Sequence, residues 1–526
     1  MASIIGDRTT SGDESLRALA RTAASKVLAR DKTDLPVDPR DPRFASEYIL
    51  ECDRLLAATP LLLQDALESA GHAAEGTNVD PYQGVVEVLQ NAEDRSARNV
   101  RVMLREAPSG QQMLIAHDGL PVEYGHVLAM ILPFVSTKRD DADQRGRFGI
   151  GLKTLRRICT DIQVHGSPYH FGSGAAVSIV EHAPEPPVPN FYDPTLDTLL
   201  VLDLERDFDR QRFEAWFAEW SDDGLIFLDH VRRFAFHHDA QTVTAHETKA
   251  TGWNDVQVVG GELVRLERRT VTAGGRRYLV HRGVVAVPYE QERFHKRTGT
   301  TTAISVATAG VEEAFGLFVA LRTRIPTALP YAFDAQFDPI ASREGIQDNK
   351  WNSWLLHQLG HVLAEAATSA IADERSLAWN LIAVPGEGLR EDRWPSNALD
   401  EALEFARTKF AALVRFDTAK DRTLAAIAYE AATLSALLDE SDVAALAPDH
   451  LSLVEKLRDR RGRWRTVLDA LAIARRLEPS DLIGGMASGL FSGKHDEWWV
   501  EAVAALAGSC EPTQLLGASI WRTDRH

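Results

Sequence analysis

The chain carries the stretch Glu87-Val-Leu-Gln-Asn-Ala-Glu-Asp94 and, further along, Gly146-Arg-Phe-Gly-Ile-Gly151. Glu87, Asn91 and Asp94 are spaced i, i+4 and i+7, so on a helix they share one face. Most neighbouring positions are apolar, which predicts a polar stripe on a helix that is otherwise buried. Burying a carboxylate and a carboxamide costs free energy unless a partner compensates them.

A hydrated Mg²⁺ ion that carries a polyphosphate is a suitable partner, because Mg²⁺ prefers oxygen ligands and keeps several waters. The glycines of the second stretch expose backbone N–H groups to phosphate, and a helix predicted over 152–158 would direct its positive dipole end there. The two stretches together predict an ATP site. Alone, the loop fits a glycine-rich turn equally well, and Leu152 separates Gly151 from Lys153-Thr154, so it is not a P-loop.

The length and composition are those of a globular protein with several domains. The 526 residues exceed the usual size of one hydrophobic core, and 44% hydrophobic and 25% charged residues are ordinary values. The sequence contains no apolar run of membrane-span length, and three widely spaced cysteines cannot form a disulfide framework. We therefore expect a cytoplasmic protein without a membrane partner. The net charge of −18 disfavours general binding to nucleic acid.

Hydrophobic periodicity predicts an α+β fold. Helices are predicted over 12–31, 44–70 and 82–97, and strands over 99–104, 112–116 and 198–204. Further strands are predicted over 230–237, 255–270, 276–287 and 301–307, with a helix over 311–321. From Trp351 onward the chain is rich in Ala and Leu at helical spacing, which predicts a helical region.

Four motifs in order resemble the GHKL ATPase superfamily. They are Glu87-x-x-x-Asn-Ala-x-Asp94, His117-Asp-Gly-Leu-Pro121, Ser136-Thr-Lys138 and Gly146-Arg-Phe-Gly-Ile-Gly151. The branch they resemble is that of heat-shock-protein-90, and within it the sacsin-type domains, which are similar to Gln90–Ala97. The resemblance covers 80–205 well and extends weakly to about 350. It implies an N-terminal helical extension (1–44), a GHKL ATP-binding α/β sandwich (45–205), a mixed α+β, transducer-like middle domain (206–350) and an all-helical C-terminal region (351–526).

The resemblance also implies roles for single residues. Glu87 would be the general base, Asn91 would ligate Mg²⁺, and Asp94 would order the helix face or contact the nucleotide through water. Either Lys138 or Lys153 would neutralise phosphate charge. The implied nucleotide-binding residues, besides Asn91 and Asp94, are His117, Asp118, Gly119, Ser136, Thr137, Lys138, Gly146, Phe148, Gly149, Ile150, Gly151, Lys153 and Thr198.

The sequence departs from the family at the adenine motif. Chaperones of this branch have an aspartate where this chain has His117, and Asp118 lies one position later. Sacsin-like proteins contain such a His-x-Gly-x-Pro form, so the departure is compatible with ATP binding. Which side chain reads adenine, and whether ATP is preferred over GTP, stay open. Thr198 is similar to the family's threonine near the adenine, and it also fits an ordinary strand residue.

A distant segment, Pro339-Ile-Ala-Ser-Arg343-Glu-Gly-Ile-Gln347, resembles the catalytic loop of the chaperone middle domain. The resemblance implies that Arg343 and Gln347 reach the γ-phosphate of ATP when a lid around 121–148 closes. The alternative is an exposed helix N-terminus that Ser342 caps.

The implied activity is slow ATP hydrolysis by a conformational switch. Its expected output is chaperone-like remodelling of protein partners, and a homodimer would fit such a switch. One alternative is an ATP-gated sensor or scaffold subunit of a bacterial anti-phage defence system. Another is a DNA-associated clamp of the MutL or gyrase kind, which the charge disfavours. A sensor histidine kinase is disfavoured because no phosphoacceptor helix precedes the ATP site as a separate module.

Overall fold

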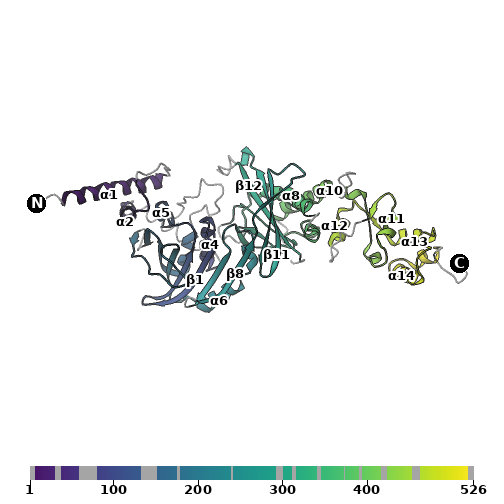
Figure 1. The fold of residues 1–526 in the computed structure, drawn as a ribbon, viewed down its shortest axis with the longest axis horizontal. Coiled ribbons are helices and arrows are strands. Elements are labelled where there is room, and N and C mark those ends of the chain that lie inside the picture. Colours follow the sequence, from purple (N-terminus) through teal and green to yellow (C-terminus); the bar gives the residue numbers. More distant parts are fainter. Residues whose placement is uncertain are drawn as a thin grey trace.

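The computed structural model describes residues 6–29, 37–58, 80–131, 151–173, 178–238, 241–291, 300–310, 315–340, 345–371, 374–389, 394–415, 423–452, 463–518 and 520. The molecule is elongated, with helix α1 at one end, a large sheet in the middle and small helices at the other end (Figure 1). The α+β fold class predicted from the sequence is confirmed.

Two helices are described before residue 80, where the sequence predicts helices over 12–31 and 44–70. They are α1 (Gly6–Ala29) and α2 (Pro42–Ala57). The second ends at Ala57, and residues 59–70 lie outside the described residues. Asp41 caps α2 by accepting a hydrogen bond from the Arg43 N–H at 2.9 Å, and Pro42 occupies the first turn, where its missing N–H costs nothing. Arg21 of α1 donates to the buried carboxylate of Glu51 in α2 at 3.0 Å, which joins the two helices.

The first part of the sheet contains eight strands in the order β8-β7-β1-β2-β6-β3-β4-β5. Neighbouring strands are antiparallel except β1 and β7, which are parallel. Their bounds are β1 (Asn99–Ala107), β2 (Gly110–His117), β3 (Cys159–Gly166), β4 (Tyr169–Ser173), β5 (Ile179–Glu181), β6 (Thr198–Leu204), β7 (Arg233–His238) and β8 (Gln241–Ala250). The strands predicted over 99–104, 112–116, 198–204 and 230–237 are confirmed.

One face of this part of the sheet is covered by helices. They are α4 (Gln83–Asp94), α5 (Tyr124–Ile131), the 3₁₀ helix η1 (Gly151–Arg157), α6 (Arg210–Glu219) and the 3₁₀ turn η2 (Asp222–Leu225). Phe191 and Tyr192, from the loop after β5, pack on the other face. The helix predicted over 152–158 is therefore present as a 3₁₀ helix, whose tighter winding is common in short segments.

The sheet continues without a break into a second part through the pairing of β8 with β10. Its strands are β9 (Asn254–Val256), β10 (Arg265–Ala273), β11 (Arg276–Ala286), β12 (Thr301–Ala309), β13 (Gly316–Val319), β14 (Leu321–Pro326) and β15 (Ala332–Ala335). The strands predicted over 276–287 and 301–307 are confirmed. The strand predicted over 255–270 is two strands, β9 and β10, that pair with each other.

The helix predicted over 311–321 is wrong in its described part, 315–321, because that segment contains β13 and the start of β14. The two strands meet in a tight turn at Ala320, which has a φ of +66°. Alanine rarely adopts this conformation. The buried carboxylate of Asp334 accepts a hydrogen bond from the Ala320 N–H at 2.7 Å, and this distant contact stabilises the turn.

The region after residue 350 is largely helical, but the prediction that it is all-helical is wrong. Strands β16 (Ile427–Glu430), β17 (Leu451–Ser452) and β18 (Arg475–Leu477) form a small parallel sheet. These strands are very short, and β16 is buried on both faces, so it lacks the alternation that marks a strand. The helices are α8 (Lys350–Ala370), α9 (Arg375–Asn380), α10 (Ser396–Leu413), α11 (Glu440–Leu446), α12 (Arg463–Leu471), α13 (Pro479–Ala487), α14 (Asp496–Ala507) and α15 (Pro512–Leu516), with 3₁₀ turns η3 (Leu424–Ala426) and η4 (Ala432–Leu434).

The hydrophobic cores follow these parts of the chain. The first core contains side chains of α1, α2, α4, η1 and the first strands, and it continues past residue 205 to Phe236 and includes Ala320 and Leu321. The second core joins the strands around β11 and β12 to α8, α9, α10 and α12, and a third lies among the last helices. The domain boundaries at 44, 205 and 350 stay predictions. Among the described residues, none of the helices combines the length and apolar character that crossing a membrane requires.

Candidate functional site

Helix α4 carries the predicted polar stripe at its buried side. Val85, Val88, Leu89 and Ala92 of α4 belong to the first core. Glu87 is itself buried, whereas Asn91 and Asp94 are partly exposed. At 3.6 residues per turn, Asn91, Glu87 and Asp94 follow one another around the helix axis, with Gly84 on one side and Gln90 and Glu93 on the other. The stripe therefore lies between Gly84, which packs on η1, and the pair Gln90 and Glu93, which bond to residues beyond 205.

The first contact brings the end of the glycine loop against α4. A Cβ atom built on Gly84 would lie 2.7 Å from the backbone nitrogen of Leu155 in η1, so only glycine allows the two segments to approach this closely. The structure thus places Gly151–Arg157 beside the helix of Glu87 and Asn91. The helix of Glu87–Asp94 and the end of the Gly146–Gly151 stretch are therefore adjacent.

Several predicted nucleotide-binding residues fall outside the described residues. They are Ser136, Thr137, Lys138, Gly146, Phe148, Gly149 and Ile150, and Arg343 as well. Gly151 and Lys153 lie within η1, of which only the backbone is described at these positions. The roles given to all of these residues stay predictions.

His117 and Thr198 lie directly opposite each other on the neighbouring strands β2 and β6. Ile115, two residues before His117, and Leu200, two residues after Thr198, both belong to the first core. Because side chains alternate between the faces of a strand, His117 and Thr198 point to the face that α4 covers. Both are buried, and the Thr198 hydroxyl has no hydrogen-bond partner among the described residues.

The imidazole of His117 is neutral at physiological pH. Burial lowers its pKa to about 4, the Arg95 and Arg101 guanidinium groups act in the same direction, and Asp118 opposes the shift. Nδ1 of His117 accepts a hydrogen bond from the Gly119 N–H at 3.2 Å, so the ring proton is on Nε2. His117 therefore presents an N–H donor on this face of the sheet, where an aspartate would present an acceptor.

Asp118 is engaged with the start of β1. One carboxylate oxygen accepts from the Arg98 N–H at 2.7 Å and the Asn99 N–H at 2.8 Å, and the other accepts from the Asn99 side chain at 2.5 Å. Burial raises the pKa of Asp118, but these hydrogen bonds and Arg101 outweigh it and leave the pKa below its usual value. Asp118 thus stabilises a turn by its own charge.

Gly119 and the residues after it are fastened to the C-terminal end of α4. A Cβ on Gly119 would lie 2.8 Å from the Arg95 carbonyl oxygen, and the Leu120 N–H donates to the same oxygen at 2.7 Å. The Arg95 guanidinium donates to the Pro121 carbonyl at 2.6 Å and to Glu123 at 3.1 Å. The described start of the predicted lid, 121–131, is therefore anchored to the helix that carries Glu87. In the sequence, Arg95 stands out only as part of the sacsin-like motif.

Gln347 is hydrogen-bonded to residues 338 and 339, shortly before α8 begins. The Gln347 side chain donates to the Pro339 carbonyl at 2.9 Å, and its N–H donates to the Asp338 carbonyl at 2.8 Å. Helix α8 begins at Lys350 and is capped by Asn349, which accepts from the Asn352 N–H at 2.8 Å. The amide of Gln347 is thus turned onto its own loop in this structure.

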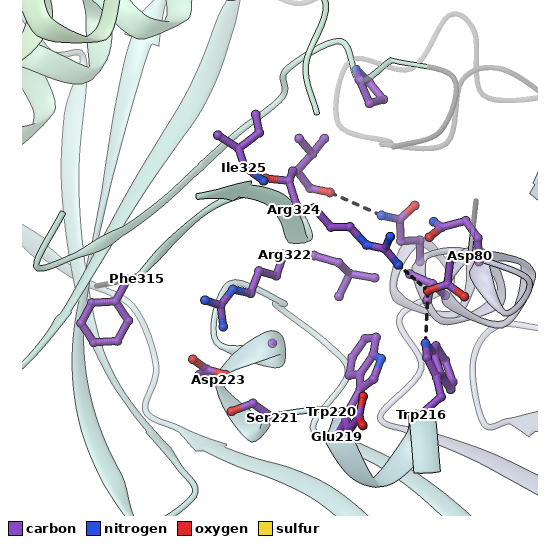
Figure 2. Close-up of a pocket in the computed structure, with 18 of the residues that line it drawn as sticks. Asp80, Trp216, Glu219, Trp220, Ser221, Asp223, Phe315, Arg322, Arg324 and Ile325 are labelled. Atoms are coloured by element: carbon purple, nitrogen blue, oxygen red, sulfur yellow. Dashed lines mark hydrogen bonds and ion pairs between the residues drawn. The ribbon is translucent and has the colours of Figure 1, made fainter. Parts of the chain in front are cut away.

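A cavity of about 610 Å³ lies between α4, α6 and the β13–β14 hairpin (Figure 2). Arg324 reaches across it to Asp80 at 3.2 Å, and the Trp216 indole donates to the same carboxylate at 3.2 Å (Figure 2). Gln90 of α4 donates to the Val319 carbonyl at 3.3 Å. Pro339 also lines the cavity, so the segment that leads to Gln347 begins next to the side of α4 that carries Gln90.

Comparisons with known proteins give little beyond this geometry. No protein-family model and no curated protein matches the chain. Of 144 solved chains that match, one is the topoisomerase IV ATP-binding domain of Francisella tularensis in complex with a small-molecule inhibitor. It shares 12% sequence identity over 35% of this chain and 94% of that chain, with a TM-score of 0.22. A similarity at this level adds no argument to the site, which rests on the residues described above.

The neutral state of His117 predicts that acid destabilises the protein. In the unfolded chain a histidine titrates near a pKa of about 6.5, whereas burial lowers the pKa of His117 to about 4 in the folded chain. Between these values the unfolded state binds one more proton, so stability falls as the pH falls from about 6.5 towards 4. At about pH 5 this loss amounts to about 2 kcal/mol from His117 alone.

The variant His117→Asn keeps an acceptor near the Gly119 N–H and removes the titrating ring. The free energy of unfolding, measured with urea at about pH 7.5 and about pH 5, should then differ between the two pH values by about 2 kcal/mol less than in the parent. An unchanged difference would show that His117 has the same pKa in the folded and unfolded states, which contradicts the lowered pKa.

Proposed function

We propose that this chain binds and hydrolyses Mg-ATP and uses the reaction as a conformational switch. The observation that carries the proposal is the close packing of η1 on α4 at Gly84, which puts the end of the glycine loop beside the polar stripe of Glu87, Asn91 and Asp94. The buried Thr198 hydroxyl and the His117 N–H face the same helical layer. These donors and acceptors suit a nucleotide, which offers phosphate oxygens at one end and a polar base at the other.

Glu87 is the general base in this proposal. Its buried carboxylate takes a proton from the water that attacks the γ-phosphorus, while the bond between that phosphorus and the bridging oxygen breaks. ADP then carries the electrons of the broken bond, and inorganic phosphate leaves with the water oxygen. Backbone N–H groups at Gly149 and Gly151 and one of Lys138 and Lys153 would bind the phosphates.

Asn91 would hold the metal through its amide oxygen. Its carboxamide is an oxygen ligand of the type that Mg²⁺ prefers, and phosphate oxygens and waters would complete the coordination. When bound, the ion neutralises phosphate charge that develops during transfer. Asp94, one turn further on, would order this face of the helix or contact the nucleotide through water.

His117 and Thr198 would recognise the purine base of the nucleotide. The Nε2–H of His117 can donate to a ring nitrogen or carbonyl oxygen, and the Thr198 hydroxyl can donate or accept. Asp118 already accepts three hydrogen bonds from Arg98 and Asn99. A pair of this kind discriminates weakly between adenine and guanine, so the proposal includes the use of both ATP and GTP.

Closure would bring the second half of the chain into the reaction. The lid around 121–148 begins at residues bonded to Arg95 of α4, and Pro339 lines the cavity beside the same helix. In the closed state Arg343 would contact the γ-phosphate and Gln347 would leave the Pro339 carbonyl to join it. The output we propose is chaperone-like remodelling of a protein partner, with the C-terminal helices, at the far end of the molecule in Figure 1, as the partner-binding part.

The test of the metal assignment is Asn91→Ala. Removal of the amide ligand should weaken Mg-ATP binding by about tenfold or more, because metal sites respond on this scale to the loss of even an indirect partner. ATP binding without Mg²⁺ should stay near that of the parent. Calorimetric titration of ATP with and without Mg²⁺ measures both.

The control for this variant is Asn254→Ala, which removes an exposed asparagine from the short strand β9. It should bind Mg-ATP like the parent. If Asn91→Ala keeps the parent's dependence on Mg²⁺, the metal assignment is wrong. If the parent itself neither binds nor hydrolyses ATP, the proposed function as a whole is wrong.

A further inference from the structure

Glu93, the next-to-last residue of α4, has a carboxylate that receives three consecutive backbone N–H groups. One oxygen accepts from the Asp229 N–H at 2.6 Å and the His230 N–H at 3.1 Å, and the other accepts from the His230 N–H at 3.1 Å and the Val231 N–H at 2.8 Å. Successive N–H groups that converge in this way form an anion-binding nest. The C-terminal turn of α4 is thereby fixed to the loop 229–231.

The same loop is bound from its other side by the middle part of the sheet. The Asp229 carboxylate accepts from Arg269 of β10 at 2.9 Å and from Arg282 of β11 at 2.5 and 2.6 Å. The indole of Trp253 donates to Asp229 at 3.3 Å, and the two guanidinium groups lie 4.3 and 4.0 Å from the centre of its ring. Charge-assisted hydrogen bonds of this kind are about twice as strong as neutral ones.

Arg269 is the buried member of this cluster, and it also bonds the residues just before loop 229–231. It donates to the carbonyls of Ile226 and Leu228 at 3.1 and 3.0 Å, in addition to Asp229. Burial and the neighbouring Arg282 lower the pKa of Arg269 to about 10, while Asp229 opposes the shift. Arg269 is therefore charged at neutral pH. Its charged guanidinium group donates both to the Asp229 carboxylate and to the carbonyls of Ile226 and Leu228.

We propose that Glu93 is a positioning residue that couples α4 to strands β10 and β11 through loop 229–231 and Asp229. The proposal rests on the proposed ATP function, because Glu87, Asn91 and Asp94 lie on the same helix. When the nucleotide shifts or rotates α4, the three N–H groups must follow the Glu93 carboxylate or lose their hydrogen bonds. Asp229 moves with them and carries Arg269 and Arg282, so the nucleotide state of α4 reaches the middle part of the sheet.

A second link between α4 and the strands after β12 is weaker. Gln90 donates a neutral hydrogen bond to the Val319 carbonyl at 3.3 Å. Glu93 instead makes four charged contacts of 2.6 to 3.1 Å, and all of them go to one short loop. Of these two links, the one through Glu93 has the shorter contacts and carries a charge.

The test is hydrogen exchange of the full chain, read by mass spectrometry, for the parent and Glu93→Gln. The glutamine keeps one acceptor oxygen but turns an NH₂ group towards N–H donors. Without nucleotide, amides in 229–231 and in strands β10 and β11 should exchange about tenfold faster than in the parent, the scale expected for the loss of a charge-assisted hydrogen bond. The control is Glu51→Gln, which neutralises another buried carboxylate, in α2, and should leave these amides unchanged.

With Mg-ATP, the parent should show altered exchange in β10 and β11, and Glu93→Gln should bind Mg-ATP within a few-fold of the parent yet lack this response. Glu93→Asp, which keeps the charge on a shorter stem, should restore part of it. Parent-like exchange of β10 and β11 in Glu93→Gln without nucleotide, or a parent-like response to nucleotide, overturns the coupling. If the parent does not bind Mg-ATP, the proposed function fails, and the nucleotide-free comparison still decides whether Glu93 couples the two parts.

Discussion

Replacing Glu87 with alanine is expected to lower ATP turnover by about 10²-fold or more, while ATP affinity stays within a few-fold of the parent. A general base acts in the transition state, so its loss changes the rate of the chemical step much more than the binding of the ground state. Steady-state phosphate release gives the turnover, and calorimetric titration of Mg-ATP gives the affinity.

Two further variants decide what kind of role Glu87 has. Glu87→Gln fills the same space in the buried site but cannot take a proton, so it should lose turnover as Glu87→Ala does. Glu106→Ala removes an exposed carboxylate at the end of β1 and should leave both quantities unchanged. If Glu87→Gln turns over ATP normally, or if both Glu87 variants lose ATP affinity as strongly as turnover, the carboxylate has a structural role.

The second large effect is expected from Gly84→Ala, which adds one methyl group to α4. In Gly84→Ala the new Cβ would lie 2.7 Å from the backbone nitrogen of Leu155, an atom that cannot move away as a flexible side chain can. We expect overpacking to destabilise the protein by about 1–3 kcal/mol. Because the clash separates η1 from α4, affinity for Mg-ATP should fall in the fraction that remains folded.

The matched control is Gly484→Ala in α13. This glycine is exposed, has no atom within 4 Å of a built Cβ and has no positive φ, so alanine should stabilise its helix by about 0.5–1 kcal/mol. Urea unfolding and Mg-ATP titration of the two alanine variants make the comparison. If Gly84→Ala resembles Gly484→Ala in both measurements, the contact between η1 and α4 does not support the nucleotide site.

The strands and helices that pack in a regular way could be predicted from the sequence. Strand β6 was predicted over 198–204, its observed bounds, because a β-rich apolar run follows a proline-rich loop. Helix α4 was predicted because its polar and apolar residues separate at helical spacing. The turn at Ala320 could not be predicted, since the residue is unfavourable there and its stabilising partner, Asp334, comes fourteen positions later.

Some residues of the candidate site could likewise be predicted from the sequence, and others could not. The stripe of Glu87, Asn91 and Asp94 could be recognised because its three members lie within one helix. The partners of Glu93 could not, because the loop 229–231 is 136 to 138 positions away and binds through backbone N–H groups, which every residue except proline has. In the sequence, Glu93 is distinguished only as a carboxylate near the end of a predicted helix.

The parallel pairing of β1 with β7 also has a consequence for biosynthesis. Strand β1 begins at residue 99, but its neighbour β7 begins only at 233, and Phe234 and Phe236 of β7 complete the core that α4 packs into. A nascent chain that has reached only residue 205 leaves one edge of β1 without its partner strand. Unpaired strand edges favour association with other chains. Until β7 has been synthesised, this edge of β1 is therefore open to pairing with a strand of another chain.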